Sequence, residues 1–265
     1  MTSTMGTDLP SAPSPAPPPA ALVTGGARRI GRAIVLALAR AGYAVAVHAN
    51  RSRAAAEELC SEIAHNGGRT GIVVADLADH DAVLGLVPAA VAAVGALTLL
   101  VNNAAGFEPD EIGHLDRARF DRHFAVNLRA PLFLAQAFAA QAPAGGAIVN
   151  MLDQRVYRPT PRYLSYGLTK SALHVATTTL AQALAPRLRV NAVAPGPALP
   201  NPRQDAEAFA RYGAAMPLGH GPTPEEIADA VLFLARAGSI TGETIAVDGG
   251  QHIDWQTAKG ADTGE

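Results

Sequence analysis

The sequence predicts one α/β domain in which a doubly wound parallel sheet is covered by helices on both faces. Short apolar runs typical of strands alternate with longer segments typical of helices from residue 20 to residue 247. Parallel strands joined in this way need right-handed crossovers, which carry the helices to the two faces of the sheet. A chain of 265 residues that is 49% hydrophobic can bury one large core, and α/β layers of this length often form a single domain.

The two ends of the chain differ from this pattern. Residues 1–19 are rich in proline and lack a basic segment followed by an apolar one, so we expect a disordered tail and no secretory signal. We expect the ordered domain to span residues 20–255 and residues 256–265 to form a flexible tail. Cys60 is the only cysteine, which fits a reducing compartment, and no long apolar run predicts a membrane span. A cytoplasmic location is therefore expected.

Charge and histidine spacing narrow the kind of partner. The formal net charge of −2 gives no electrostatic footprint for nucleic acid or for an acidic membrane surface. The eight histidines show no spacing typical of metal ligands, so no metal site is predicted. A small molecule is the expected partner.

The first βα unit carries a glycine turn. A strand over residues 20–24 stops at Gly25, and a helix rich in alanine and leucine then continues to Gly42. Glycine at 25 and at 31 lets the backbone turn tightly, while the N-terminus of the helix offers free N–H groups to a pyrophosphate. A nucleotide site is the direct interpretation. An ordinary turn between a strand and a helix, which also uses glycine, is the alternative.

The next elements repeat the alternation. Strands are expected at 43–49, 70–74 and 97–101, with helices at 53–66 and 79–94 between them. Gly25 follows the first strand, at residues 20–24, while Asp76 and Asn102 follow the strands at 70–74 and 97–101. They are therefore expected at the carboxyl edge of the sheet, where folds of this type bind their ligands.

The end of the second strand indicates which nucleotide is bound. A site for NAD usually places Asp or Glu there to accept hydrogen bonds from the ribose, whereas this chain has His48-Ala49-Asn50-Arg51-Ser52. Arg51 and Ser52 suit a 2′-phosphate, and Arg29 of the glycine turn can reach the same region. NADPH is therefore predicted. The alternative is that Arg51 only caps a surface loop.

The second half continues the sheet and ends in a long loop. Strands are expected at 147–151, 189–193 and 244–247, and helices around 120–141, at 163–184 and from Thr223, which precedes Pro224 as an N-cap. A proline-rich substrate loop is expected at about 195–222, with a short helix at 205–212. Long loops in compact domains are often lids, so this loop is expected to close over the substrate.

Tyr166 and Lys170 form a pair with chemical consequences. Residues four apart on a helix share one face, about one turn apart. An ammonium near a phenol favours the phenolate, so we expect Lys170 to lower the pKa of Tyr166 and make it a usable proton donor and acceptor. A tyrosine and a lysine on a solvated helix face is the alternative that the pair alone does not exclude.

The motifs occur in the order and spacing of the short-chain dehydrogenase/reductase family, which the chain resembles from residue 20 to about residue 250. That resemblance implies a Rossmann-type fold. It rests on the following positions: Thr24-Gly25 with Arg29 and Gly31, Asp76, Asn102-Asn103-Ala104, Asn127, Tyr166 with Lys170, Pro195-Gly196 and Val247-Asp248-Gly249-Gly250.

The resemblance implies roles for these residues. Tyr166 would be the proton donor, Lys170 would hold the nicotinamide ribose, and Asn127 would mark a backbone kink that holds a water molecule in the proton relay. A homotetramer with interfaces near the helix of Tyr166 is also implied. The positions implied for the cofactor are Gly25, Arg28, Arg29, Ile30, Gly31, His48, Asn50, Arg51, Ser52, Asp76, Leu77, Asn103, Ala104, Ala105, Tyr166, Lys170, Pro195 and Gly196.

Asp153 departs from the family pattern. Thirteen residues before the tyrosine, the family usually has a serine that bonds a substrate carbonyl. An ionised carboxylate only accepts hydrogen bonds and repels a developing alkoxide, so simple carbonyl reduction is not favoured. A pterin suits the carboxylate better, because it offers N–H groups and accepts a hydride at a C=N carbon. Its ring nitrogen then needs a proton, which Asp153 can relay or supply.

These features resemble the branch of pteridine reductases and dihydromonapterin reductases. Arg29 in the glycine turn, the ending of the second strand and Phe107 match that branch. Phe107 would stack on the pterin, with the nicotinamide on the other side, so the expected substrate-binding residues are Phe107, Asp153 and Tyr166. The expected catalytic residues are Tyr166, Lys170, Asp153 and Asn127.

Two other functions remain open at this point. One is the reduction of a different carbonyl or imine substrate. The other is a non-catalytic sensor that binds NADPH, although a sensor would have no need for Tyr166, Lys170 and Asn127 together.

Overall fold

The computed structural model describes residues 18–200 and 205–254. Almost all of the predicted N-terminal tail, the predicted C-terminal tail and residues 201–204 of the predicted substrate loop lie outside these ranges. Among the described helices, none is both long and apolar enough to cross a membrane.

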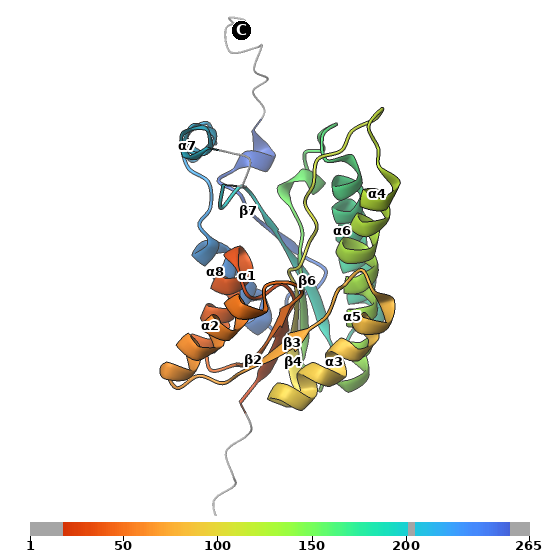
Figure 1. The fold of residues 1–265 in the computed structure, drawn as a ribbon, viewed down its shortest axis with the longest axis vertical. Coiled ribbons are helices and arrows are strands. Elements are labelled where there is room, and N and C mark those ends of the chain that lie inside the picture. Colours follow the sequence, from red (N-terminus) through yellow and green to blue (C-terminus); the bar gives the residue numbers. More distant parts are fainter. Residues whose placement is uncertain (1–17, 201–204, 255–265) are drawn as a thin grey trace, which may run out of the picture.

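A parallel sheet forms the centre of the molecule (Figure 1). Its strands run in the spatial order β3-β2-β1-β4-β5-β6-β7, and every neighbouring pair is parallel. The prediction of a doubly wound parallel sheet is therefore confirmed. The strands are β1 (Ala20–Val23), β2 (Ala44–Ala49), β3 (Thr70–Val74), β4 (Leu97–Asn102), β5 (Ala147–Met151), β6 (Arg189–Pro195) and β7 (Thr244–Val247).

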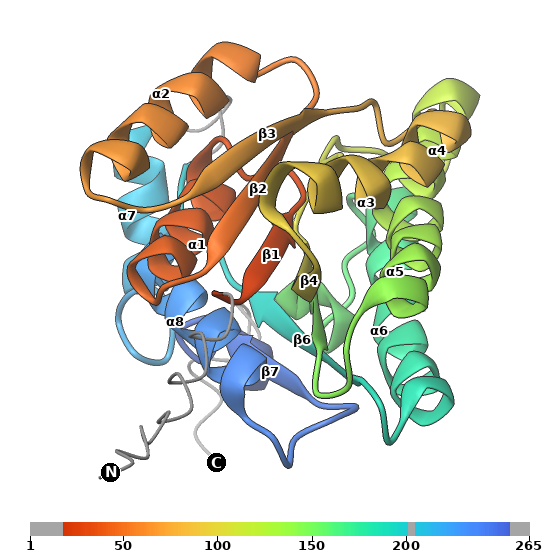
Figure 2. The ribbon, with the colours of Figure 1, turned by 90° about the horizontal axis from the view of Figure 1, so that it is seen from below.

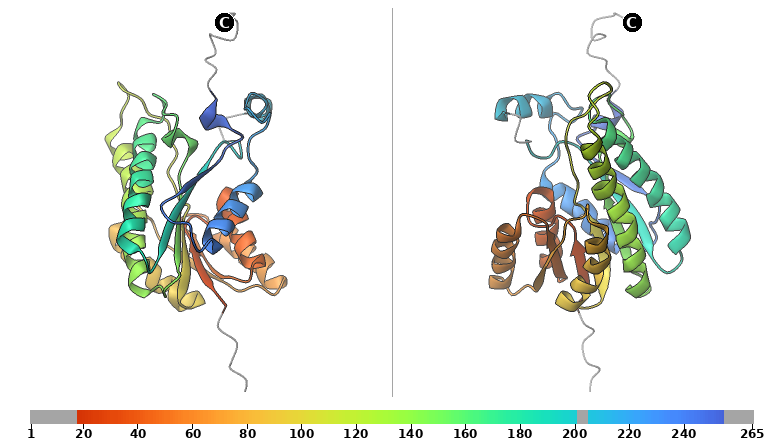
Figure 3. Two further views of the ribbon diagram at one scale, coloured as in Figure 1. Left: turned by 180° about the vertical axis from the view of Figure 1, so that it is seen from behind. Right: turned by 45° about the vertical axis from the view of Figure 1, so that its right-hand side comes forward.

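Helices cover both faces of the sheet, as Figure 2 shows from below and Figure 3 from two further sides. On one face lie α1 (Arg29–Arg40), α2 (Arg53–His65) and α8 (Pro224–Arg236). On the other lie α3 (His80–Val94), α4 (Arg117–Phe124), α5 (Ala130–Gln141) and α6 (Leu164–Leu184). The short helix α7 (Ala206–Ala214) stands beyond the carboxyl edge of the sheet, at the top of Figure 1.

The strand β1 is apolar along its whole length because both of its faces are buried. In β1, Ala20 and Leu22 belong to one core cluster, while Ala21 and Val23 belong to the cluster on the opposite face. This is the pattern expected of a parallel sheet between two helical layers, and it explains why the strands read as continuous hydrophobic runs. The two cores fix the sheet, and the loops at its carboxyl edge remain available for function.

The predicted helix around residues 120–141 is interrupted, which corrects the sequence-based boundaries. α4 begins at Arg117, and residues Ala125–Arg129 form a π-helical turn before α5 begins. A π-turn adds a residue to one helical turn and often occurs at a functional site. Asn127 lies in this turn, so the predicted backbone irregularity at that residue is confirmed.

Candidate active site

The order of the strands reverses beside β1, and the chain segments after β1 and β4 meet at this point. Thr24 joins them, because its Oγ1 accepts hydrogen bonds from the backbone N–H of Asn103 (2.9 Å) and of Ala104 (3.0 Å). The side-chain amide of Asn103 donates to the carbonyl oxygens of Thr24 (2.8 Å) and Gly25 (3.1 Å). The crevice at this switch point is therefore rigidly framed, as expected for a ligand site in an open α/β sheet.

A groove of about 760 Å³ follows this crevice across the ends of β1, β2 and β4, and we call it the nucleotide groove. It brings together most of the residues predicted for the cofactor. Its lining includes Gly25, Arg28, Arg29, Ile30, Gly31, His48, Asn50, Arg51, Ser52, Asp76, Leu77, Asn103, Ala104 and Ala105.

The glycine turn leaves room and donors for a phosphate group. Gly25 has a left-handed φ of 62°, and a Cβ added to Gly31 would lie 2.1 Å from the carbonyl oxygen of Gly25. Behind the turn, the N-cap residue of α1, Arg28, makes no side-chain capping bond. The first N–H groups of the helix are thus left for an anion, which the positive end of the helix dipole also favours. These features fit a dinucleotide.

The side chain of His48 holds the glycine turn through a hydrogen bond to its backbone. Its Nδ1 accepts a hydrogen bond from the backbone N–H of Gly25 (3.0 Å), and its Nε2 lies 3.1 Å from the carbonyl oxygen of Ala75. The proton therefore belongs on Nε2, and the imidazole is neutral. Burial lowers the pKa of His48, against the opposing effects of the Ala75 carbonyl and the Asp76 carboxylate.

Two basic residues of the groove have different positions. Arg51 lies exposed on its wall beside Ser52, and their role at a 2′-phosphate stays a prediction. The guanidinium of Arg29 instead donates to the carbonyl oxygens of Pro200 (3.0 Å) and Leu199 (3.1 Å) in the loop after β6. The loop after β6 thus supplies acceptors for the Arg29 side chain, and the expectation that Arg29 reaches the region of Arg51 stays a prediction.

A second cavity of about 700 Å³ adjoins the groove, and we call it the dyad cavity because Tyr166 and Lys170 line it. Pro195 and Gly196, predicted for the cofactor, line this cavity rather than the nucleotide groove. Arg29, Ile30, Asn103, Ala105 and Phe107 line both spaces, so the two are continuous with each other.

Tyr166 and Lys170 lie on the buried face of α6, one turn apart. The hydroxyl of Tyr166 donates to Asp153 Oδ2 at 2.9 Å, and Lys170 Nζ donates to the carbonyl oxygen of Met151 at 2.7 Å. The Nζ atom also lies 5.7 Å from the centre of the Tyr166 ring. The sequence therefore placed the pair correctly on a buried helix face and not on a solvated one.

The expected lowering of the Tyr166 pKa by Lys170 was wrong for this structure. Burial and the adjacent Asp153 carboxylate raise the pKa of Tyr166 well above its ordinary value, and Arg155 opposes this only in part. Burial lowers the pKa of Lys170 to about 8, with Asp153 acting in the opposite direction. In this environment Tyr166 is held as a phenol that can donate a proton.

Asp153 is the most heavily bonded carboxylate of the cavity. Besides Tyr166, it accepts hydrogen bonds from Nη1 of Arg155 on both of its oxygens (2.9 and 3.1 Å) and from the backbone N–H of Arg155 (2.9 Å). The Arg155 guanidinium also lies beside the rings of Phe107 (5.5 Å) and Tyr163 (5.2 Å). Asp153 thus acts as an acceptor throughout, and its partner Arg155 is a site residue that the sequence reasoning missed.

Phe107 and Asn127 are held by neighbouring contacts. The ring of Phe107 stacks on Tyr163 at 4.5 Å and meets Tyr166 edge-on at 4.8 Å. Asn127 Oδ1 accepts from the backbone N–H of Gly106 (2.8 Å), while its Nδ2 donates to the Gly106 carbonyl (3.0 Å) and to Thr169 Oγ1 (3.2 Å). One face of the Phe107 ring is therefore covered by Tyr163, and a ligand that stacks on Phe107 has to use the other face. No sequence motif predicted this contact.

Among the described residues, no group of three or more His, Cys, Asp or Glu side chains is arranged to hold a metal ion. The chemistry-bearing groups of the dyad cavity are instead a phenol, an ammonium, a carboxylate and a guanidinium, at Tyr166, Lys170, Asp153 and Arg155. This set can donate protons and bind polar atoms of a ligand, and the adjoining groove can hold a dinucleotide.

Comparison with known proteins gives a consistent set of matches. The family model for enoyl-(acyl carrier protein) reductase matches residues 25–252. The crystal structure of FolM alternative dihydrofolate reductase 1 from Brucella canis, complexed with NADP, superposes with a TM-score of 0.88 at 48% identity, covering 92% of this chain and 97% of that chain.

Two further proteins are similar at lower identity. A short-chain dehydrogenase/reductase from Serratia marcescens superposes with a TM-score of 0.84 at 36% identity, covering 90% of this chain and 100% of that one. L-xylulose reductase from Mesocricetus auratus is 38% identical over 240 residues, which cover 87% of this chain and 95% of the relative.

Proposed function

The chain belongs to the short-chain dehydrogenase/reductase family and is an oxidoreductase of that type, and within this family we propose that it uses NADPH to reduce a pteridine. The proposed site consists of the nucleotide groove for the cofactor and the dyad cavity for the substrate. Dihydropterins of the biopterin or monapterin type are the proposed substrate class, with reduction at a C=N bond.

The cofactor assignment is supported by the groove and by the relatives. The FolM protein of Brucella canis, 48% identical, is complexed with NADP. In this chain, the glycine turn and the free N-terminus of α1 suit a pyrophosphate, and Arg51 with Ser52 suits a phosphate on the adenosine ribose. When bound, NADPH supplies a hydride, which carries two electrons to the substrate carbon.

The observation that carries the substrate assignment is the hydrogen bond between Tyr166 and Asp153. The carboxylate stands where a hydroxyl would be needed to donate to a ketone oxygen, and it accepts every bond that it makes here. A pteridine presents N–H groups, for which a carboxylate is a good partner. The similar Brucella canis protein is an alternative dihydrofolate reductase, which agrees with a pteridine ring as the substrate.

We assign the protein groups the following roles in that reaction. Tyr166, a phenol with a raised pKa, delivers the proton that the ring nitrogen needs after the carbon has received its hydride. Asp153 orients the Tyr166 hydroxyl and accepts from N–H groups of the substrate. Lys170 binds the ribose of the nicotinamide nucleotide, Asn127 holds the segment after β4, and Phe107 stacks on the ring. A homotetramer stays a prediction.

The test is turnover of a panel of dihydropteridines by the purified protein with NADPH, followed by loss of NADPH absorbance at several pH values. We expect turnover of at least one dihydropteridine and loss of that activity in Tyr166→Phe. No turnover of any pteridine at any pH would contradict the proposal. Tight NADPH binding with no activity that depends on Tyr166 would favour a sensor instead.

A second candidate is reduction of a carbonyl substrate, because L-xylulose reductase is 38% identical to this chain. The Tyr166–Lys170 pair is compatible with such a reaction, while Asp153 opposes it through its charge. L-xylulose in the same assay separates the two candidates.

A further inference from the structure

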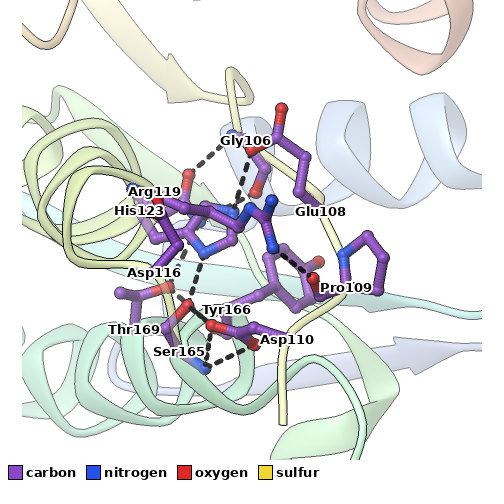
Figure 4. Close-up of polar contacts among 11 residues, drawn as sticks. Gly106, Glu108, Pro109, Asp110, Asp116, Arg119, His123, Ser165, Tyr166 and Thr169 are labelled. Atoms are coloured by element: carbon purple, nitrogen blue, oxygen red, sulfur yellow. Dashed lines mark hydrogen bonds and ion pairs between the residues drawn. The ribbon is translucent and has the colours of Figure 1, made fainter. Parts of the chain in front are cut away.

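Three buried polar side chains from three separate elements form a connected group directly beside Tyr166 (Figure 4). Asp110 lies in the segment between β4 and α4, which we call the 103–116 segment. His123 belongs to α4, and Ser165 belongs to the first turn of α6. His123 and Ser165 are fully buried, and Asp110 is 5% exposed. None of the three is used in the roles assigned above.

Asp110 caps α6 from outside that helix. The N-cap residue of α6, Tyr163, is in the left-handed conformation (φ 61°) and makes no side-chain capping bond. The carbonyl oxygen of Asp110 accepts from the N–H of Leu164 at 3.1 Å, and its carboxylate accepts from the N–H of Ser165 at 3.1 and 3.3 Å. A carboxylate at this end of a helix satisfies free N–H groups and complements the helix dipole.

The hydroxyl of Ser165 extends this contact to α4. It bonds Asp110 Oδ2 and lies 2.6 Å from His123 Nδ1. Because an ionised carboxylate only accepts, the Ser165 hydroxyl donates to Asp110 and accepts from His123. The proton of His123 is therefore on Nδ1. Its Nε2 makes no hydrogen bond, and the closest ion-pair partner of that atom is Glu108 Oε2 at 3.9 Å.

The same segment has a second anchor on the other side of Phe107. Asn127 holds both backbone polar groups of Gly106, one residue before Phe107, while Asp110 is fixed three residues after it. Between these anchors, the ring of Phe107 stacks on Tyr163 and meets Tyr166 edge-on. Both tyrosines stand at the start of α6, which is the end that Asp110 caps.

We propose that Asp110, Ser165 and His123 are positioning residues that fix Phe107 against Tyr166 and thereby shape the substrate side of the dyad cavity. The inference goes beyond the proposed function, because it holds for whichever substrate enters that cavity. The three residues act through Phe107 and Tyr166 and touch neither the glycine turn nor the end of β2. Substrate affinity is therefore expected to depend on them more than NADPH affinity does.

The test compares Ser165→Ala and His123→Leu with the unaltered protein. His123→Leu breaks the bond to Ser165, and Ser165→Ala breaks both side-chain bonds of Ser165, to His123 and to Asp110. We expect the KM of the substrate to rise about three- to tenfold in His123→Leu, the usual consequence of losing one buried hydrogen bond, and at least as much in Ser165→Ala. The expected change in kcat is smaller, and the Kd of NADPH stays within about twofold. His123→Asn should restore most of the KM, because an asparagine amide can donate from nearly the position of Nδ1.

Asp116→Ala provides a matched control in the same segment. Asp116 is the N-cap of α4, and its Oδ1 accepts from the N–H of Arg119 at 2.8 Å. Asp116→Ala removes a carboxylate cap from α4, as loss of Asp110 would from α6, and lowers the free energy of unfolding. The hydrogen bonds around Ser165 stay intact in this variant. An unchanged KM in Asp116→Ala together with a raised KM in Ser165→Ala supports positioning. A KM that Ser165→Ala and His123→Leu leave unchanged, in folded protein, overturns it.

One further readout does not depend on the variants folding, and a second does not depend on the substrate being a pteridine. The imidazole ¹⁵N spectrum of the unaltered protein should show His123 protonated on Nδ1, and protonation on Nε2 alone would overturn the inference. Kinetics are run in parallel with a 7,8-dihydropteridine and with L-xylulose. If only L-xylulose is reduced, the proposed function fails, while the positioning role is decided on the KM of that sugar.

Discussion

The hydroxyl of Tyr166 donates a hydrogen bond to Asp153 Oδ2 at 2.9 Å, and both groups line the dyad cavity. This contact places a negative charge next to the proposed proton donor, so the carboxylate and burial together raise the pKa of the phenol. The charge of Asp153 therefore has a measurable consequence for the pH dependence of activity as well as for substrate choice.

Asp153→Asn should lower the pKa of Tyr166. The substitution removes the charge that disfavours the phenolate, while the side chain keeps its size. The alkaline limb of kcat/KM against pH, where Lys170 or Tyr166 loses its proton, should move to lower pH, because Asp153 raises the pKa of both groups. Asp205→Asn is the control, because Asp205 lines the same cavity but its carboxylate accepts from the backbone of Ala208. Equal profiles for the two variants would contradict the assignment of the limb to the Tyr166–Lys170 pair.

Arg155→Met should destabilise the fold. The guanidinium of Arg155 bonds both oxygens of Asp153, and its removal leaves a largely buried carboxylate without its cation. A loss of about 1–3 kcal/mol in the free energy of unfolding is expected from breaking such a pair. Arg158→Met breaks a more exposed pair with Asp254 and should cost less than about 1 kcal/mol. Denaturant titration measures both, and similar losses would mean that the Asp153 pair has no special weight.

Acid should weaken both the fold and NADPH binding through His48. Its pKa is lowered in the folded protein, so the unfolded chain binds the proton first as the pH falls. The contribution of neutral His48 to the free energy of unfolding is fully present above the ordinary histidine pKa of about 6.5. It is lost as the pH falls from there through the lowered pKa that His48 has in the folded protein. Protonation of Nδ1 also breaks its bond from the Gly25 N–H, which shapes the glycine turn.

His48→Gln is the matched comparison for this effect. Glutamine keeps an acceptor for Gly25 but does not titrate. The Kd of NADPH, measured by fluorescence at pH 7.5 and 5.5, should rise with acid in the unaltered protein and rise less in the variant. His123, whose pKa burial also lowers, is present in both proteins and cancels in the comparison. The same acid response in both proteins would exclude His48 as its cause.

Gly31→Ala should weaken NADPH binding. The added Cβ would lie 2.1 Å from the Gly25 carbonyl oxygen, a distance that no real contact allows, so the turn has to shift. A stability loss of about 1–3 kcal/mol and a Kd of NADPH raised at least about tenfold are expected. Gly85→Ala in α3 is the control, because its Cβ meets nothing within 4 Å and should stabilise the helix by up to about 1 kcal/mol. A Kd unchanged in Gly31→Ala would contradict the proposed position of the pyrophosphate.

The fold could be predicted because its physical causes are local. Strands buried on both faces, such as β1 and β4, appear in the sequence as continuous apolar runs, and the glycine turn and the Thr223 cap mark the ends of elements. The π-turn at Ala125–Arg129 was less visible, since its residues are compatible with an ordinary helix. Only the resemblance to a family suggested an irregularity at Asn127.

The parts of the site that escaped prediction depend on contacts between distant segments. The bonds from Ser165 to Asp110 join residues 55 positions apart, and the 103–116 segment that carries Asp110 has no periodic pattern. The direction of the Arg29 side chain depends likewise on the loop after β6. To predict the raised pKa of Tyr166, one has to know how deeply the phenol is buried and how close it lies to Asp153. Neither follows from the spacing of Tyr166 and Lys170.

The role of Asp153 in selecting a pteridine is measured by the ratio of kcat/KM for a 7,8-dihydropteridine to kcat/KM for L-xylulose, in the unaltered protein and in Asp153→Ser. We expect a ratio that favours the pteridine in the unaltered protein. We also expect a fall of about 100-fold or more in Asp153→Ser, as the hydroxyl gains a carbonyl partner and the N–H groups lose their acceptor. Reduction of L-xylulose without any reduction of the pteridine, or a ratio that Asp153→Ser leaves unchanged, would contradict this role of Asp153.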